Sequence, residues 1–140
     1  MSEFTVVVGD WHSLQQHAQH IRELVFILEQ DIAPEDEWDD QDPISIHFVV
    51  YDADQPIATA RLLSNDHVGR VAVLKDYRSK GIGKLVMQEI IALAKQQQRK
   101  ELILSSQVYA TQFYSGLGFA VQGESYLDCG IPHVDMVMVL

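Results

Sequence analysis

A chain of 140 residues, 47% hydrophobic and 21% charged, has the length and composition of one globular domain, which we assign to residues 1–140. Its net charge of −10 disfavours nucleic acid, which needs a basic surface, and no apolar run approaches the roughly 18 residues of a membrane span. The single cysteine, Cys129, cannot form an internal disulfide, and the first residues lack the pattern of a signal peptide. We therefore expect a cytoplasmic protein.

In chain order, the first expected elements are a short strand, Phe4–Val8, and an amphipathic helix. Apolar residues recur at spacings of three and four from Trp11 to Leu28, which is the pattern of a helix with one face on a core. The acidic segment Asp31–Pro43 contains two prolines and shows no periodicity, so it is expected to be a loop.

Strands and helices are expected to alternate after the acidic segment. The elements are the strands Ile46–Tyr51, Ile57–Leu63 and Val68–Leu74, a helix reaching Gln98, the strand Glu101–Ser105, a short helix Ala110–Leu117, and the strands Phe119–Leu127 and Val134–Leu140 around the turn Asp128–His133. The first two strands should form a hairpin, and the long helix should link parallel strands. The order β-α-β-β-β-α-β-α-β-β predicts an α/β (α+β) fold with a mixed sheet of about six or seven strands and about four helices.

Acidic and basic residues are segregated along the chain. Eight acidic residues and no basic ones lie between Glu29 and Asp42, whereas nine of the ten Lys and Arg residues lie between Arg61 and Lys100. The first region should attract cations and the second should attract anions. This polarity predicts an anionic ligand that meets a cationic one.

The segment YRSKGIGKLVMQEI, Tyr77–Ile90, places two glycines where a helical pattern begins. Glycine costs a helix roughly 0.5–1 kcal/mol relative to alanine, so something should approach this backbone closely. A dinucleotide-binding fingerprint would need glycine at Val86, and a P-loop would need glycine at Arg78. What remains is a helix start with free amides and basic neighbours, which favours a pyrophosphate.

Two motifs resemble those of the GNAT acetyltransferase superfamily. The sequence R-x-x-G-x-G, here Arg78 to Gly83 after the strand sequence VAVL, resembles its acyl-CoA pyrophosphate loop. The segment QVYATQFYSGLGF resembles its N-x-x-A-x-x-x-Y-x-x-x-G-F pattern, with Gln107 in place of asparagine. Narrower matches in RELVFILEQ, EWDDQD, GRVAVL and GIPH are similar to the ElaA-like branch of that superfamily.

The resemblance implies acetyl-CoA as co-substrate and no metal. The backbones of Val71 and Val73 would pair with the pantetheine, and the Val73 amide would polarise the acetyl carbonyl. The residues that it assigns to the cofactor are Val71, Val73, Arg78, Ser79, Lys80, Gly81, Ile82, Gly83, Lys84, Gln107 and Tyr114. His17 and His20 have no third ligand nearby in the sequence, so they do not indicate a metal site.

By the same resemblance, Tyr114 is the general acid, since a phenol with a pKa of ~10 is protonated at neutral pH and can donate to a thiolate. A core aromatic beside Phe113 is the structural alternative. The base that deprotonates the amine is left open among Glu37, Asp39 and His133.

The expected activity is acetyl transfer from acetyl-CoA to a primary amine of a cationic small molecule or peptide, by direct attack in a ternary complex. One alternative is an inactive module that binds CoA or docks a basic partner through the acidic segment. Another is an acyltransferase like the acyl-homoserine-lactone synthases, whose N-terminal pattern RELVF and EWDDQD resemble. Whether the protein forms a homodimer is left open.

Overall fold

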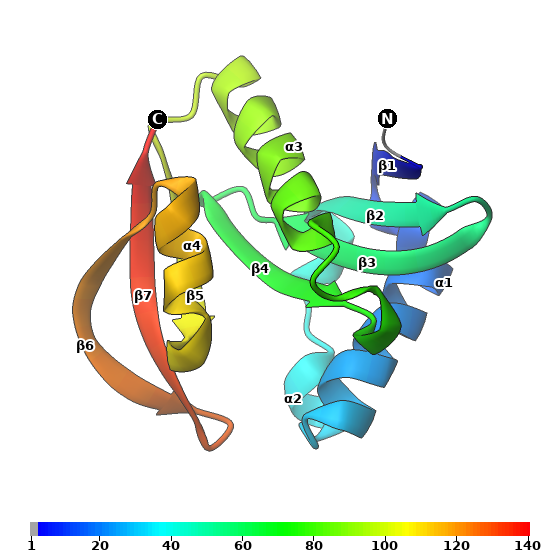
Figure 1. Ribbon diagram of the computed structural model, residues 1–140, viewed down its shortest axis with the longest axis horizontal. Coiled ribbons are helices and arrows are strands. Elements are labelled where there is room, and N and C mark those ends of the chain that lie inside the picture. Colours follow the sequence, from blue (N-terminus) through cyan, green and yellow to red (C-terminus); the bar gives the residue numbers. More distant parts are fainter. Residues whose placement is uncertain (1–2) are drawn as a thin grey trace.

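The computed structural model describes residues 3–140 and contains a seven-stranded mixed sheet with helices on both faces (Figure 1). The strands are β1 (Phe4–Gly9), β2 (Ile46–Asp52), β3 (Gln55–Leu62), β4 (His67–Val73), β5 (Glu101–Gln107), β6 (Ala120–Asp128) and β7 (Ile131–Val139). The α-helices are α1 (Trp11–Arg22), α2 (Pro34–Glu37), α3 (Ile82–Gln96) and α4 (Thr111–Leu117). The predicted α/β class with its mixed sheet is confirmed.

The strands lie in the order β1-β2-β3-β4-β5-β7-β6. Of the neighbouring pairs, β4 and β5 are parallel, and the others are antiparallel. The predicted hairpin is β2–β3, and the predicted crossover helix is α3, which connects the two parallel strands. None of the helices within residues 3–140 is long and apolar enough to span a membrane.

Alternation along the central strands produces a core on each face of the sheet. In β2, Phe48 and Val50 are buried in the larger core with α3, whereas Val49 between them is buried in a smaller core with α1. Side chains of a strand point to opposite faces in turn, so a fully apolar run such as this one indicates a central strand covered on both sides. The two helices therefore sandwich the sheet (Figure 1).

The first helix differs from the prediction in its second half. Asp10 caps α1 by accepting a hydrogen bond from the Ser13 amide at 2.8 Å, but after Arg22 the chain continues as a π-helix, Glu23–Glu29. A π-helix has a wider turn, so the apolar spacing of an α-helix no longer keeps one face on the core. Leu28, predicted to face the core, is 66% exposed.

Two predicted loops are more ordered and tighter than expected. The acidic segment contains the short helix α2, with Pro34 at its start, and a 3-10 turn, Asp42–Ile44. Proline is favoured in the first turn of a helix, so the prolines begin structure here instead of excluding it. The predicted turn Asp128–His133 shrinks to Cys129 and Gly130, whose positive φ angles of 52° and 76° are those of a tight hairpin turn.

Candidate active site

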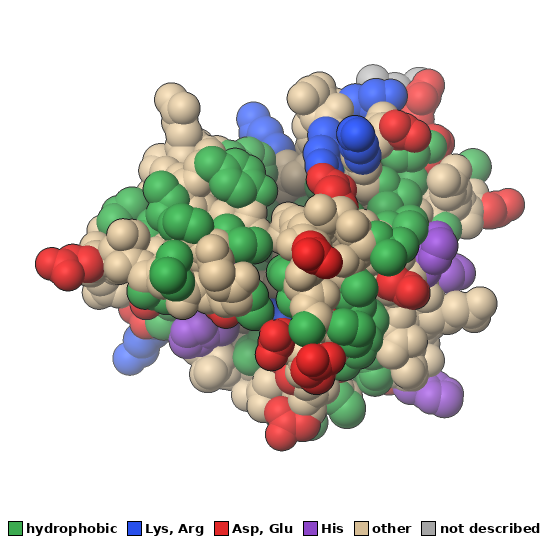
Figure 2. Space-filling view, turned by 90° about the horizontal axis from the view of Figure 1, so that it is seen from below, with side chains coloured by type: hydrophobic (Ala, Val, Ile, Leu, Met, Phe, Trp, Pro, Cys, Tyr) green, Lys and Arg blue, Asp and Glu red, His purple; other side chains and the backbone are tan. Residues whose placement is uncertain are grey.

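A cavity opens where the two parallel strands separate. β4 and β5 pair at His67 with Ile103 and at Val68 with Leu104, and the register extends no further. Beyond these pairs a cavity of about 510 Å³ lies between the strands. In the space-filling view from below, it appears as a hollow beside a group of acidic side chains (Figure 2).

A bulge in β4 lies at the point where the strands part. The register of β4 with β3 shifts between Thr59 and Arg61, and Arg70 in β4 has a positive φ of 53°. A bulge adds twist and ends regular pairing, and it can redirect a side chain. It gives Arg70 a direction that the strand alternation does not predict.

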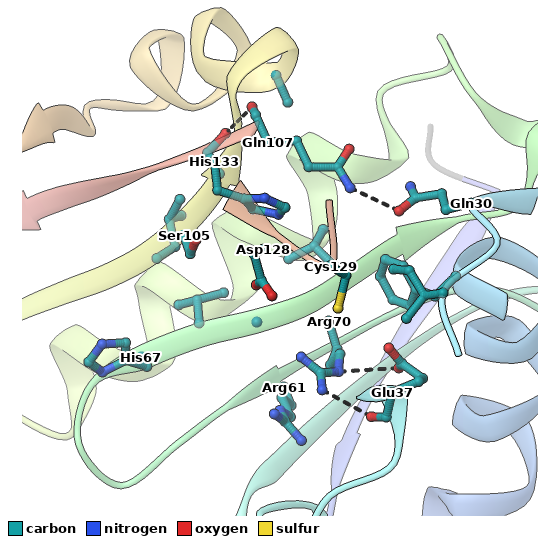
Figure 3. A pocket seen from close by; sticks show the side chains of 18 of the residues that line it. Gln30, Glu37, Arg61, His67, Arg70, Ser105, Gln107, Asp128, Cys129 and His133 are labelled. Carbon is teal, nitrogen blue, oxygen red and sulfur yellow. Dashed lines mark hydrogen bonds and ion pairs between the residues drawn. The ribbon is translucent and has the colours of Figure 1, made fainter. Parts of the chain in front are cut away.

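The cavity has two walls and a rim (Figure 3). β5 and α4 with the turn before it contribute Ser105, Gln107, Ala110 and Tyr114; β3 and β4 contribute Arg61, His67, Gly69, Arg70 and Val71; the rim includes Gln30, Asp36, Glu37, Asp128, Cys129 and His133. Among the predicted site residues, Glu37, Val71, Gln107, Tyr114 and His133 meet here. Asp39, Val73 and the loop Arg78–Lys84 are not in its lining.

Tyr114 lies half-buried on the α4 side of the cavity. Its ring makes edge contacts with Phe113 and Phe119 at centroid distances of 5.0 and 6.1 Å. Burial, with a smaller effect of Tyr109, raises the pKa of Tyr114 to about 12. The phenol is therefore protonated at neutral pH. Its ring packs with aromatic neighbours, as the structural alternative predicted, while the residue also lines the cavity.

Three arginines form ion pairs with three carboxylates of the acidic segment. Arg22, Arg61 and Arg70 pair with the carboxylates of Glu37, Asp39 and Asp42, and we call these six side chains the arginine–carboxylate network. The nitrogen–oxygen distances are 2.7 Å for Arg22–Glu37, 2.8 Å for Arg22–Asp42, 2.7 Å for Arg61–Asp39, 2.9 Å for Arg61–Asp42, 3.2 Å for Arg70–Glu37 and 3.3 Å for Arg70–Asp39. The expectation that the acidic segment attracts cations is therefore wrong for Glu37, Asp39 and Asp42, which are already paired with arginines.

Asp39 is a poor proton acceptor in this network. Arg61 donates to both of its oxygens, at 2.7 and 2.8 Å. These hydrogen bonds lower the pKa of Asp39 to about 2 against the opposing effect of burial. A carboxylate this acidic takes up no proton near neutral pH, so its environment argues against Asp39 as the base.

The same ion pair gives Asp39 a testable effect on acid stability. Its folded-state pKa of about 2 is below the ordinary value of 3.8, so its charge stabilises the fold above pH ~4, and this contribution is lost as the pH falls towards 2. Between these limits the wild type should lose more stability than Asp39→Asn, as measured by thermal unfolding at a series of pH values. Parallel curves for the two proteins would contradict this assignment.

Glu37 is the better placed carboxylate. It is 2% exposed, and Arg22 donates to its Oε2 at 2.7 Å. Burial raises the pKa of Glu37, partly offset by the charges of Arg70 and Arg22. Unlike Asp39, it lines the cavity and retains basicity closer to neutral pH.

The predicted pyrophosphate loop leads into α3. Gly81 caps the helix with a left-handed φ of 79°, and Ser79 has a φ of 64°. The Arg78 guanidinium binds both oxygens of Glu29, at 2.6 and 2.7 Å. The Ile82 side chain is buried in the larger core, so at this position only the backbone is available to a cofactor.

Residues 15–140 match the family model described as an acetyltransferase (GNAT) domain. The chain belongs to the GNAT family. It is 37% identical over 124 residues to the Bacillus subtilis protein named as an uncharacterized N-acetyltransferase, YjcF, covering 86% of this chain and 89% of that one.

Solved GNAT structures share the fold. Escherichia coli ElaA has a TM-score of 0.87 at 25% identity, with 96% of this chain and 99% of that one covered, which agrees with the predicted ElaA-like branch. A GNAT family acetyltransferase from Elizabethkingia anophelis, solved with acetyl-CoA bound, has a TM-score of 0.73 at 14% identity, with 100% of both chains covered.

In this GNAT chain, the second glycine of the loop also has a packing role. A Cβ on Gly83 would lie 3.2 Å from the Phe113 ring, which in turn contacts Tyr114. A Cβ on Gly81 would meet nothing within 4 Å, but its positive φ disfavours other residues. The two glycines are thus constrained by different causes even without a ligand.

If the loop binds a pyrophosphate as the sequence predicts, Gly83→Val is expected to lower CoA affinity by about tenfold or more, because two or three amide-to-phosphate hydrogen bonds would be lost. The displaced Phe113 ring is a competing cause, and the double variant Gly83→Val with Phe113→Ala separates the two. Calorimetric titration with CoA should show the loss in both proteins when each is compared with its glycine parent. Full recovery in the double variant would mean that Gly83 serves only the packing.

The two remaining predicted residues, Gln107 and His133, lie opposite each other on the paired strands β5 and β7. Gln107 donates from Nε2 to Gln30 Oε1 at 2.8 Å across the cavity mouth (Figure 3). His133 Nδ1 lies 2.7 Å from the Ile131 carbonyl, so Nδ1 carries the proton and donates, and Nε2 is left as an acceptor. His133 therefore stays a candidate base beside Glu37.

Proposed function

We propose that this GNAT protein is an acetyl-CoA-dependent N-acetyltransferase that acetylates a primary amine by direct attack in a ternary complex. The carrying observation is that one cavity brings together the protonated phenol of Tyr114, the buried carboxylate of Glu37 and the unpaired edge of β4. The Elizabethkingia anophelis protein of the same fold, which holds acetyl-CoA, supports the choice of co-substrate.

The residues present fit acetyl-CoA. Beyond Val68, no strand within residues 3–140 pairs with β4 on its β5 side, so the backbone at Val71 and Val73 can pair with an extended pantetheine. The Val73 carbonyl would first have to release Arg78 Nε, which donates to it at 3.0 Å. The loop Arg78–Lys84 offers the N-terminus of the fifteen-residue helix α3 and three basic side chains to a pyrophosphate. Arg78 would exchange its exposed pair with Glu29 for the phosphate.

The reaction needs a base for the amine, a donor to the acetyl oxygen and an acid for the thiolate, and the chain offers a residue for each. Glu37, or alternatively His133, would accept the proton of the attacking amine, and the Val73 amide would donate to the acetyl oxygen. Tyr114 would protonate the departing thiolate. The burial that raises the pKa of Tyr114 acts in the same direction on a thiolate in the same cavity, so donor and acceptor stay matched.

The test is product formation. The protein is incubated with acetyl-CoA and a panel of primary amines, and N-acetylated products are detected by mass spectrometry. Mass detection is preferable to thiol reagents because Cys129 is an exposed free thiol. Acetylated product supports the proposal; CoA binding by calorimetry with no product from any amine would favour the inactive CoA-binding module instead.

A further inference from the structure

Arg70 presents an unused donor to the cavity. Its hydrogen bonds to the Glu37 carbonyl at 2.9 Å, to the Asp36 carbonyl at 3.5 Å and to Asp39 Oδ2 at 3.3 Å all come from Nη2. Its Nη1 bonds to no residue within the described part of the chain, and the side chain is 25% exposed while lining the cavity (Figure 3). A guanidinium is a five-donor fork that matches a carboxylate, so this one has capacity for another anion.

Arg61 stands behind it with a second unused donor. It is 5% exposed, and although its Nη atoms bind Asp39 and Asp42, its buried Nε has no hydrogen-bond partner within residues 3–140. Gly69 lies against it: a Cβ there would be 4.0 Å from Nε. The glycine therefore adds no side chain between the cavity and this guanidinium, and buried donors without partners are rare enough to need a cause.

The charges of the network do not fully satisfy Arg70. Each of the three carboxylates is shared by two arginines, as the ion pairs show. Burial lowers the pKa of Arg70, and the charges of Glu37 and Asp39 only partly offset it. The Nη1 of Arg70 is therefore a donor that the network leaves for an added anion.

The rim of the cavity has the opposite sign. Asp36 and Asp128 line it, both exposed and outside the arginine–carboxylate network. Arg70 adjoins Val71, one of the two residues of β4 whose backbone is proposed to pair with the pantetheine arm that carries the acetyl group. A ligand bound by Arg70 with an amine that reaches this stretch must carry its anionic and amino groups within a few bonds of each other.

We propose that the acceptor is an α-amino acid whose carboxylate binds Arg70, with Arg61 behind it, and whose amine is acetylated. This inference rests on the proposed N-acetyltransferase function and names its substrate class. A zwitterion uses both the guanidinium inside and the acidic rim, whereas a purely cationic acceptor would leave the free donor of Arg70 unused.

The test uses three matched acceptor series: the common L-amino acids, their carboxamides, and the corresponding amines without the carboxyl group. Acetyl-CoA is saturating, and N-acetyl products are measured by mass spectrometry. A carboxamide has no negative charge to accept charge-assisted hydrogen bonds from Arg70. Replacing the carboxylate by a carboxamide should therefore lower kcat/KM by about ten- to a hundredfold. At least one amino acid should therefore exceed its carboxamide by that factor.

Variants of Arg70 test whether this residue causes the preference for amino acids over their carboxamides. Arg70→Gln should reduce the acid-to-carboxamide ratio to near one, and Arg70→Lys should restore part of it, since lysine keeps the charge without the fork. Lys95→Gln, on the exposed face of α3, should leave the ratio unchanged. CoA titration and circular dichroism confirm that each variant is folded.

Two results would overturn the proposal, and they are distinguishable. Carboxamides or simple amines acetylated as well as the amino acids by the wild type would reject the substrate class while leaving the N-acetyltransferase function intact. No product from any of the three series would reject both. The wild-type comparison alone decides between these outcomes, so the proposal does not depend on the folding of any variant.

Discussion

Tyr114→Phe is expected to lower turnover by about 10²–10⁴-fold while leaving acetyl-CoA affinity nearly unchanged. The change removes the one proton that the proposed mechanism delivers to the departing thiolate, and general acid catalysis contributes an effect of that size. Phenylalanine keeps the ring that packs with Phe113 and Phe119, so the fold should persist. Steady-state kinetics and calorimetric CoA titration measure the two parts of the expectation.

A matched control is Tyr109→Phe. Tyr109 lines the same cavity but is 78% exposed, and the same hydroxyl is removed there. It should change turnover far less than Tyr114→Phe. Near-normal turnover of Tyr114→Phe would leave Tyr114 as a packing residue, and an equal loss in both variants would indicate a general effect on the cavity.

Burial also predicts the pH behaviour of this acid. Because the pKa of Tyr114 is raised to about 12, the phenol keeps its proton through the alkaline range in which most proteins remain folded. A low rate on the alkaline side would then have to come from another group. This follows from the burial of the Tyr114 hydroxyl beside Phe113 and Phe119, which the sequence pattern alone did not quantify.

The elements that the sequence predicted well are those with a strong period. β2 and β3 alternate or run apolar, and α3 carries its apolar residues at helical spacing, so side-chain patterning alone fixes their type. The failure at Leu28 has a local cause, since a π-helical turn needs no distinctive residue and breaks the period that the prediction relied on.

Site residues that belong to a sequence motif were predicted, whereas residues that pair with the motif from distant segments of the chain were missed. Glu37, Gln107 and Tyr114 lie in the cavity, but the partners of the acidic segment do not follow from its own composition. One signal was present: Arg61 lies two residues after Thr59 in a strand that is otherwise apolar from Pro56 to Leu62, and both are buried. An arginine at an inward strand position indicates a buried carboxylate partner.

Arg70 had no such signal. Its side chain reaches the cavity because its backbone adopts a φ of 53° in the bulge, a conformation that sequence alternation cannot show. His67 and Cys129 likewise enter the lining through the ends of strands. These positions depend on how β4, β5 and the β6–β7 turn meet in space.

The arginine–carboxylate network links stability to the site, because Glu37 belongs to both. Arg22 is 1% exposed and donates to Glu37 at 2.7 Å and to Asp42 at 2.8 Å, between the rings of Trp11 and Trp38 at 5.6 and 5.0 Å. Arg22→Met keeps much of the volume but leaves two carboxylates buried without this partner. We expect a loss of about 3–5 kcal/mol in the free energy of unfolding.

The loss should depend on pH in a defined direction. Without Arg22, Glu37 would be protonated more easily, because the charge of Arg22 opposes the effect of burial, which raises the pKa of Glu37, and a protonated carboxyl is cheaper to bury. The difference from wild type in urea unfolding should therefore be larger near pH 8 than near pH 5. Arg78→Met is the matched control, because its ion pair with Glu29 is 38% exposed on each side and should contribute at most about 1 kcal/mol. Equal losses for the two variants, or a loss for Arg22→Met that does not change with pH, would show that the buried charges are not what makes Arg22 important.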